Sequence, residues 1–215
     1  TLRPLAGVLS MVLEAKRMGL KQVMLPIENA PEGLLVKGIE VIPVHTFTEA
    51  IGYFKNEWTP AQVKAPIQEK ISFPINFSDV QGQAHVKRAM EVAAAGGHNL
   101  MLVGPPGSGK TMLARRIPTI LPQMDTQEAL EVTKIYSILG LTSTRGSLIT
   151  ERPFRSPHHT ISQAGLIGGG SNPKPGEVSL AHRGVLYMDE LPEFSKPALE
   201  VLRQPLEDHE VTSGG

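Results

Sequence analysis

The hydrophobic residues near the start of the chain recur every three or four positions, at Val8, Met11, Val12 and Ala15. This spacing predicts a helix over residues 8–19, which Gly19 would end. Two short apolar runs, at 22–25 and 39–44, predict strands, and a further helix with Thr48 as its cap is expected to follow. The order helix, strand, strand, helix is typical of a small α/β unit.

A proline-rich stretch separates this first region, residues 1–56, from the rest of the chain. Residues 57–78 contain Pro60, Pro66 and Pro74 among mixed polar residues. Because proline disfavours helix interiors and central strands, we expect an extended linker here. The chain therefore divides into a small leading domain, a linker and a larger domain over residues 79–215.

The larger region alternates helical patterns with short, continuous apolar runs. A helix is expected over 83–95, and the runs at 100–103 and 185–188 have the composition of buried parallel strands. Further helices are expected after the first run and over residues 126–139 and 197–207. This alternation predicts an α/β fold with a doubly wound parallel sheet flanked by helices.

Composition and charge exclude several classes of protein. Lys plus Arg and Asp plus Glu both number 21, so the net charge is zero and no global field favours nucleic acid. The absence of cysteine excludes disulfides and thiolate metal sites, and it fits a reducing cytoplasm. No apolar run has the length of a membrane span, so we expect no membrane partner. Since Thr1 is not a natural first residue, we interpret the chain as an internal piece of a longer protein.

The segment GPPGSGKT, residues 104–111, matches the phosphate-loop pattern G-x-x-x-x-G-K-[ST]. Its glycines allow backbone angles that a Cβ would forbid, so that N–H groups can surround phosphate oxygens. Lys110 can reach the β- and γ-phosphates of ATP during catalysis, and the Thr111 hydroxyl can bind Mg²⁺. The alternative is a glycine-rich surface turn, but the expected strand before it and helix after it favour ATP binding. The predicted phosphate-binding residues are Gly104, Pro105, Pro106, Gly107, Ser108, Gly109, Lys110 and Thr111.

A pair of acids, Asp189 and Glu190, follows the apolar run at 185–188. Ligand sites in open α/β sheets lie at the carboxyl ends of strands, so Asp189 should emerge beside the phosphate loop and hold Mg²⁺. Glu190 is then placed to orient or deprotonate the attacking water. The alternative is two solvated acids after a core strand, which the phosphate loop in the same chain makes the weaker interpretation.

The stretch between these motifs, residues 141–183, is rich in glycine and predicts an insertion that projects from the sheet. It is locally basic, with Arg145, Arg152, Arg155, Lys174 and Arg183 against Glu151 and Glu177. Such a patch suits nucleic-acid phosphates, although a solvated surface segment explains it equally well. The adjacent His158 and His159 have no third ligand nearby, so a structural or subunit-contact role is favoured over a metal site.

Several segments together resemble the magnesium-chelatase-like AAA+ proteins, and within them the ComM (YifB) group. They are VQGQ at 80–83, GPPGSGKT at 104–111, RPFRSPHH at 152–159, GLIGGG at 165–170, PGEVSLAH at 175–182 and GVLYMDELPEF at 184–194. The resemblance implies an AAA+ P-loop ATPase that uses ATP and Mg²⁺, forms a homo-hexamer and acts on DNA in branch migration. It adds Val80 and Gln83 near the adenine, and Met112 directly after the loop, to the expected nucleotide-binding residues.

The first region resembles the end of a Lon-type protease domain. In Lon proteins the helix that matches residues 7–15 carries a catalytic lysine, and Met11 takes that place here. Because methionine cannot accept a proton, the resemblance implies that this chain is not a protease. It also implies that residues 79–215 form an incomplete ATPase core, without the sensor residue, arginine finger and helical lid of the family.

Two other functions remain open from the sequence. A chelatase-type ATPase would remodel a protein partner for insertion of Mg²⁺ into a porphyrin. A nucleotide-dependent assembly module would bind ATP without hydrolysing it. The protease-like leading region favours an ATPase acting on DNA over the chelatase.

Overall fold

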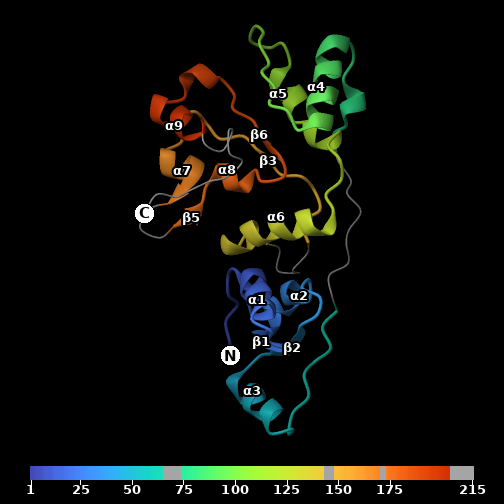
Figure 1. Cartoon of the computed structure of the whole chain (residues 1–215), viewed down its shortest axis with the longest axis vertical. Helices are drawn as coiled ribbons and strands as arrows, with labels where there is room; N and C mark the ends of the chain where they lie inside the picture. The colour runs from blue at the N-terminus through green and yellow to red at the C-terminus, as the bar shows by residue number, and fades with distance from the viewer. Residues whose placement is uncertain (65–73, 143–147, 170–172, 204–215) are drawn as a thin grey trace. The chain divides into compact units, whose positions relative to one another are not determined.

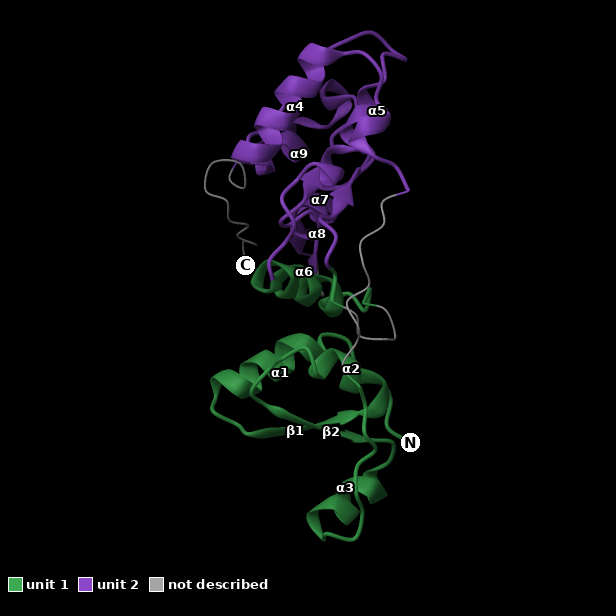
Figure 2. Cartoon of the chain, turned by 90° about the vertical axis from the view of Figure 1, so that its right-hand side faces the viewer, with its two compact units in different colours: residues 1–69, 126–149 green, residues 70–125, 150–215 purple. Residues whose placement is uncertain are grey.

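The computed structural model describes residues 1–64, 74–142, 148–169 and 173–203, and Figure 1 shows the order of the elements along the chain. The chain forms two compact units, coloured separately in Figure 2. Unit 1 combines residues 1–69 with residues 126–149, and unit 2 combines residues 70–125 with residues 150–215. Each of the two units is therefore built from segments that are not continuous in sequence.

Unit 1 is a small α/β structure around a parallel pair of strands. Strand β1 (Gln22–Pro26) pairs with β2 (Glu40–Val44), with Gln22 opposite Glu40 and Pro26 opposite Val44. Helix α1 and the turns between the strands supply the core, in which Val8, Leu9, Val12, Leu25, Val36 and Ile39 pack together. The helices of the unit are α1 (Val8–Arg17), η1 (Ile27–Asn29), α2 (Ala30–Gly33), α3 (Phe47–Phe54) and α6 (Thr126–Ile138).

Both strands and all three longer helices of unit 1 were expected from the sequence, and the structure confirms them with small shifts at the ends. The predicted cap at Thr48 is wrong. Thr46 caps α3 instead, since its side chain accepts a hydrogen bond from the Glu49 N–H over 3.2 Å. Thr46 has the extended backbone that a cap requires, whereas Thr48 already lies inside the helix.

Helix α6 packs against α1 within unit 1, although it follows the phosphate loop in sequence. Its Leu130 contacts the apolar core of the unit, and the Gly7 N–H donates to the Ser137 carbonyl over 2.9 Å. The division into compact units thus groups residues differently from the predicted domains 1–56, 57–78 and 79–215, whose boundaries stay a prediction. Part of the predicted linker, residues 65–73, lies outside the described residues.

Unit 2 consists of short elements grouped in two apolar clusters. Phe77, Val80, Met90 and Leu113 form one cluster, and Leu166, Ala198 and Leu202 form the other. Its helices are η2 (Phe77–Asp79), α4 (Ala84–Gly96), α5 (Lys110–Ala114), η3 (Ile117–Thr119), α7 (Gln163–Ile167), α8 (Glu177–Leu180), η4 (Leu191–Glu193) and α9 (Lys196–Val201). Its strands are β3 (Phe154–Arg155), β4 (Gly168–Gly169), β5 (Lys174–Pro175) and β6 (Val185–Leu186).

The strands of unit 2 pair two by two. β3 runs parallel to β6, and β4 runs antiparallel to β5. The fold is therefore mixed α/β with small sheets, and the described residues do not assemble the extended parallel sheet that the alternating pattern predicts. The helix predicted over 197–207 is present as α9, and its last residues lie outside the described part of the chain.

The prediction of a buried strand at residues 100–103 is wrong. No regular element covers these residues, and Met101 and Val103 are 75% and 85% exposed. A parallel strand becomes buried only when neighbouring strands and covering helices remove it from water. Within the described residues β6 pairs with β3, and nothing pairs with this apolar segment.

No helix in the described part of the chain is both long and apolar enough to cross a membrane.

Candidate functional site

The phosphate loop, residues 104–111, has the backbone that its glycines allow. Gly107 and Gly109 have φ angles of 76° and 85°, in the left-handed region where a side chain would be strained. The ammonium group of Lys110 donates to the carbonyls of Gly104 and Pro105 over 2.8 Å and 2.9 Å. The Lys110 side chain therefore contacts the backbone at the start of the loop, and helix α5 begins at Lys110.

The structure brings the loop together with the first of the two predicted acids. The Thr111 hydroxyl donates to the Asp189 carboxylate over 2.9 Å. Thr111 is the second residue of α5, and Asp189 lies three residues after the end of β6. The two halves of the predicted site are therefore in direct contact within unit 2.

Tyr187 joins this contact from the same segment as Asp189. Its hydroxyl lies 3.3 Å from the Thr111 hydroxyl, and its ring stacks on Phe154 with centroids 6.1 Å apart. Burial raises the pKa of the Tyr187 phenol, so it stays a neutral hydroxyl at physiological pH. The Thr111 hydroxyl thus lies beside two side-chain oxygens, those of Tyr187 and Asp189, from the segment that follows β6.

The Asp189 carboxylate stays ionised at neutral pH. The hydrogen bond from Thr111 is the largest cause that lowers the pKa of Asp189, and the hydroxyl of Tyr187 and the backbone N–H of Glu190 add to it. A charged carboxylate beside a hydroxyl oxygen is the donor set that a hard divalent cation such as Mg²⁺ prefers. These residues therefore fit the metal predicted for them.

Glu190, the second acid, has an unusual backbone. Its φ angle is 52°, in the left-handed region that non-glycine residues rarely adopt. Its N–H donates to the Asp189 carboxylate over 3.1 Å, and its own carboxylate is 3.8 Å from Nδ1 of His159. The turn after β6 therefore directs the two acids differently, with Asp189 toward Thr111 and Glu190 toward His159.

The residues expected near the adenine occupy different environments. Val80 is buried in the cluster around Phe77, and its carbonyl accepts a hydrogen bond from the Lys87 ammonium group. Gln83 is exposed, and its amide donates to the Ser108 carbonyl in the phosphate loop over 3.4 Å. Met112 follows the loop on α5, where its side chain is 38% exposed.

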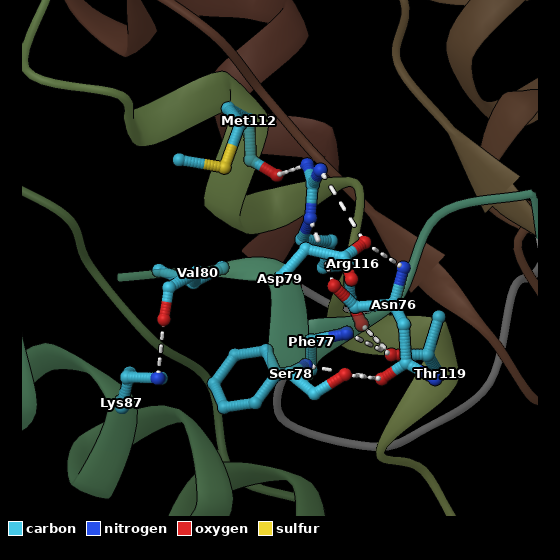
Figure 3. A network of polar contacts seen from close by, with 9 residues as sticks. All are labelled: Asn76, Phe77, Ser78, Asp79, Val80, Lys87, Met112, Arg116 and Thr119. Carbon is cyan, nitrogen blue, oxygen red and sulfur yellow. Dashed lines mark hydrogen bonds and ion pairs between the residues drawn. The ribbon is translucent and has the colours of Figure 1, made fainter. Parts of the chain in front are cut away.

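A polar network ties the segment before Val80 to the helix that follows the phosphate loop (Figure 3). Arg116 donates to the carbonyls of Asn76 and Met112 over 3.0 Å and 3.1 Å, and it lies 4.0 Å from the Asp79 carboxylate. The Phe77 N–H donates to the Thr119 hydroxyl over 3.2 Å. Because Arg116 contacts both Asn76 and Asp79, we expect the position of residues 76–79 to depend on Arg116.

The sequence reasoning missed Tyr187, Arg116 and the contact of His159 with Glu190. Tyr187 was the one with a signal, because residues two apart on a strand share a face and Tyr187 is two positions before Asp189. Arg116 lies beyond the phosphate-loop motif, and no sequence pattern relates it to Asn76.

The basic residues of the insertion are partly engaged within unit 2. Arg155 forms a two-point ion pair with Glu177, over 2.6 Å and 2.7 Å, and Arg152 donates to the carbonyls of Pro122 and Arg183. Arg145 lies outside the described residues. Nowhere in the described ranges do three or more His, Asp or Glu side chains gather as a metal site.

Comparison with known proteins places these motifs in a family. A family model described as "Magnesium chelatase, subunit ChlI" matches residues 76–213, which is more than half of the chain. The chain is 40% identical to the Escherichia coli protein YifB and 39% identical to the competence protein ComM of Haemophilus influenzae. Each of these matches covers 98% of this chain, but only 41% and 42% of the relative.

A further relative is Lon protease 2 of Bacillus subtilis, which is 32% identical over 68% of this chain and 27% of its own length. The chain spans about two fifths of the length of YifB and of ComM. With the family model covering both the phosphate loop and the acidic pair, the chain belongs to the magnesium chelatase subunit ChlI family, alongside YifB and ComM.

Proposed function

We propose that this chain is the nucleotide-binding part of an AAA+ ATPase that uses ATP hydrolysis to move or remodel DNA. The observation that carries the proposal is the 2.9 Å hydrogen bond between Thr111 and Asp189. It supports a single site in which the phosphate loop and the acidic pair act together. Membership of the magnesium chelatase family supports an ATPase of the AAA+ type.

Each residue has a separate task in this proposal. The N–H groups of residues 104–109 and the Lys110 ammonium group bind the phosphates, which requires Lys110 to leave the carbonyls of Gly104 and Pro105. Thr111 and Asp189 hold Mg²⁺, which would neutralise charge on the phosphate oxygens. Glu190 orients and deprotonates the attacking water. Val80, Gln83 and Met112 border the base.

DNA is the polymer that we propose, because one relative is a competence protein and because the insertion is basic. A homo-hexamer is proposed as the working assembly, as in AAA+ proteins generally. The family name supports the second candidate, a chelatase-type ATPase that remodels a protein partner. We expect no proteolysis, since Met11 stands where the related proteases have lysine and is 53% exposed on α1.

The test is the ATP turnover of the intact protein, measured alone and with single-stranded, duplex and branched DNA. We expect DNA to stimulate turnover, and Glu190→Gln to lower turnover about a hundredfold or more while ATP binding persists. Turnover that no DNA stimulates would favour the chelatase-type function. ATP binding without turnover in the wild type would support an assembly module instead.

A further inference from the structure

His159 and Glu190 follow two neighbouring strands, β3 and β6, and lie close together. The two strands are parallel, with Phe154 opposite Val185 and Arg155 opposite Leu186. Both chains leave the pair in the same direction, and each turns a few residues later, at His159 and at Glu190. The Nδ1 atom of His159 is 3.8 Å from the Glu190 carboxylate.

The His159 ring is held on two sides. It lies against the ring of His158, with centroids 4.0 Å apart and the rings tilted by 35°, and it meets Phe194 edge-on at 6.4 Å. The Nδ1 atom of His158 is engaged elsewhere, because it lies 2.9 Å from the Thr160 hydroxyl and accepts the Thr160 N–H. Of the two adjacent histidines, His159 is therefore the one with a nitrogen toward Glu190.

Glu190 depends on a neighbouring side chain for its orientation more than Asp189 does. Its side chain is 69% exposed, whereas the His159 side chain is 30% exposed. An exposed glutamate samples several rotamers, and a general base works only in those that reach the water. At 3.8 Å the pair is longer than a hydrogen bond, and a small rotation of the exposed side chain closes it.

We propose that His159 is a positioning residue for Glu190, and that it restrains the carboxylate in the orientation needed to activate water. This proposal rests on the proposed function, because it assigns a task to His159 only if Glu190 is the base. His159 acts through Glu190 and does not itself contact ATP.

A matched pair of variants tests this role in the intact protein. His159→Phe keeps a ring between His158 and Phe194 but removes the nitrogen that faces Glu190. His158→Phe keeps a ring against His159 and leaves that nitrogen in place. We expect His159→Phe to lower kcat about tenfold, with KM and the binding of a fluorescent ATP analogue unchanged, and His158→Phe to change kcat by less than about twofold.

A double variant separates positioning from a structural effect. If His159 acts only through Glu190, His159→Phe should cause no further loss of turnover in a Glu190→Gln background. In the protein without nucleotide, Glu190→Gln should shift the ring NMR signals of His159 and leave those of His45, which lies beside Glu49, unchanged.

The outcomes are distinct. Equal kcat for His159→Phe and wild type, a faster His159→Phe variant, or additive losses in the double variant would overturn the positioning role. If neither wild type nor any variant hydrolyses ATP, the proposed function fails. The ring signals then still decide whether His159 and Glu190 are in contact.

Discussion

The Thr111 hydroxyl donates a 2.9 Å hydrogen bond to Asp189, although the two residues are 78 positions apart. Thr111 ends the phosphate-loop motif, and Asp189 begins the acidic pair. The bond therefore makes one site of two motifs that are separated in sequence by part of unit 2 and by helix α6 of unit 1. Substitutions at either end should change the behaviour of the other.

Replacing Thr111 with valine should weaken Mg²⁺-dependent nucleotide binding by at least about tenfold, because the hydroxyl that we propose to hold Mg²⁺ is lost. Valine keeps the branched shape of threonine, so the fold should persist. Titration of a fluorescent ATP analogue with and without Mg²⁺ measures the effect. Thr48→Val, at an exposed position of α3, is the control and should bind as wild type does. Equal binding by both variants would show that the Thr111 hydroxyl contributes nothing.

Replacing Tyr187 with phenylalanine should have a smaller effect. The ring stack on Phe154 remains, and only the 3.3 Å contact with Thr111 is lost, which we expect to cost about 0.5–1 kcal/mol of stability. Since burial raises the pKa of Tyr187, the variant should lose a phase of the tyrosine absorbance titration that lies above the ordinary range of a phenol. Loss of a phase at the ordinary pKa of a phenol would contradict the partly buried position of this hydroxyl.

Replacing Arg116 with alanine should loosen the segment that leads to Val80. The carbonyls of Asn76 and Met112 lose their donor, and Asp79 loses its neighbouring cation (Figure 3). We expect a loss of about 1–2 kcal/mol in the free energy of unfolding and faster hydrogen exchange at the Phe77 to Val80 amides. Arg115→Ala, at an exposed neighbouring position, should leave both unchanged. Equal exchange rates in the two variants would rule out this role.

Local sequence signals were sufficient for much of the fold. The periodic apolar residues predicted α1 and α6 closely, and α4 matches the helix expected over 83–95 and ends at Gly97, whose φ is 65°. The short parallel pair β1–β2 was visible as two apolar runs. These elements depend on neighbours in sequence or on a single strand partner, which is why they could be predicted.

The predictions that fail concern structural features that depend on residues far apart in the sequence. The apolar run at 100–103 has the composition of a buried strand, but strand formation needs a paired neighbour that the described residues do not supply. Helix α6 was predicted correctly as a helix, yet its packing on α1 could not be derived from its own pattern. Likewise, the motifs identified Thr111 and Asp189, while Arg116 and His159 became visible only through their contacts.

Replacing Glu32 with alanine should destabilise unit 1. Glu32 is 5% exposed, its carboxylate accepts the Leu9 N–H over 3.1 Å, and the Ser137 hydroxyl on α6 also donates to it. Removing it leaves buried donors on α1 and α6 without an acceptor, at about 1–3 kcal/mol for each. Urea unfolding measures the loss, and Glu28→Ala, at an exposed position nearby, is the matched control. Equal unfolding of the two variants would show that water replaces the carboxylate.

The stabilising effect of Asp189 should depend on pH in a definite direction. The Thr111 hydrogen bond, helped by the hydroxyl of Tyr187 and the Glu190 N–H, lowers the pKa of Asp189 in the folded protein. A group whose pKa is lower in the folded state binds fewer protons there than in the unfolded chain, so its stabilisation is present above the unfolded pKa. It is lost as the pH falls through the folded pKa.

Urea unfolding of wild type and Asp189→Asn from neutral to acidic pH tests this linkage. The difference in stability between the two proteins should be largest near neutral pH and should close as the pH falls below the ordinary range of an aspartate. Glu200 is an exposed acid on α9, and Glu200→Gln is the control. Its free energy of unfolding should follow that of wild type in parallel at every pH. If the Asp189→Asn curve also stays parallel to wild type, the carboxylate titrates alike in the folded and unfolded protein, and Thr111 is not its partner in solution.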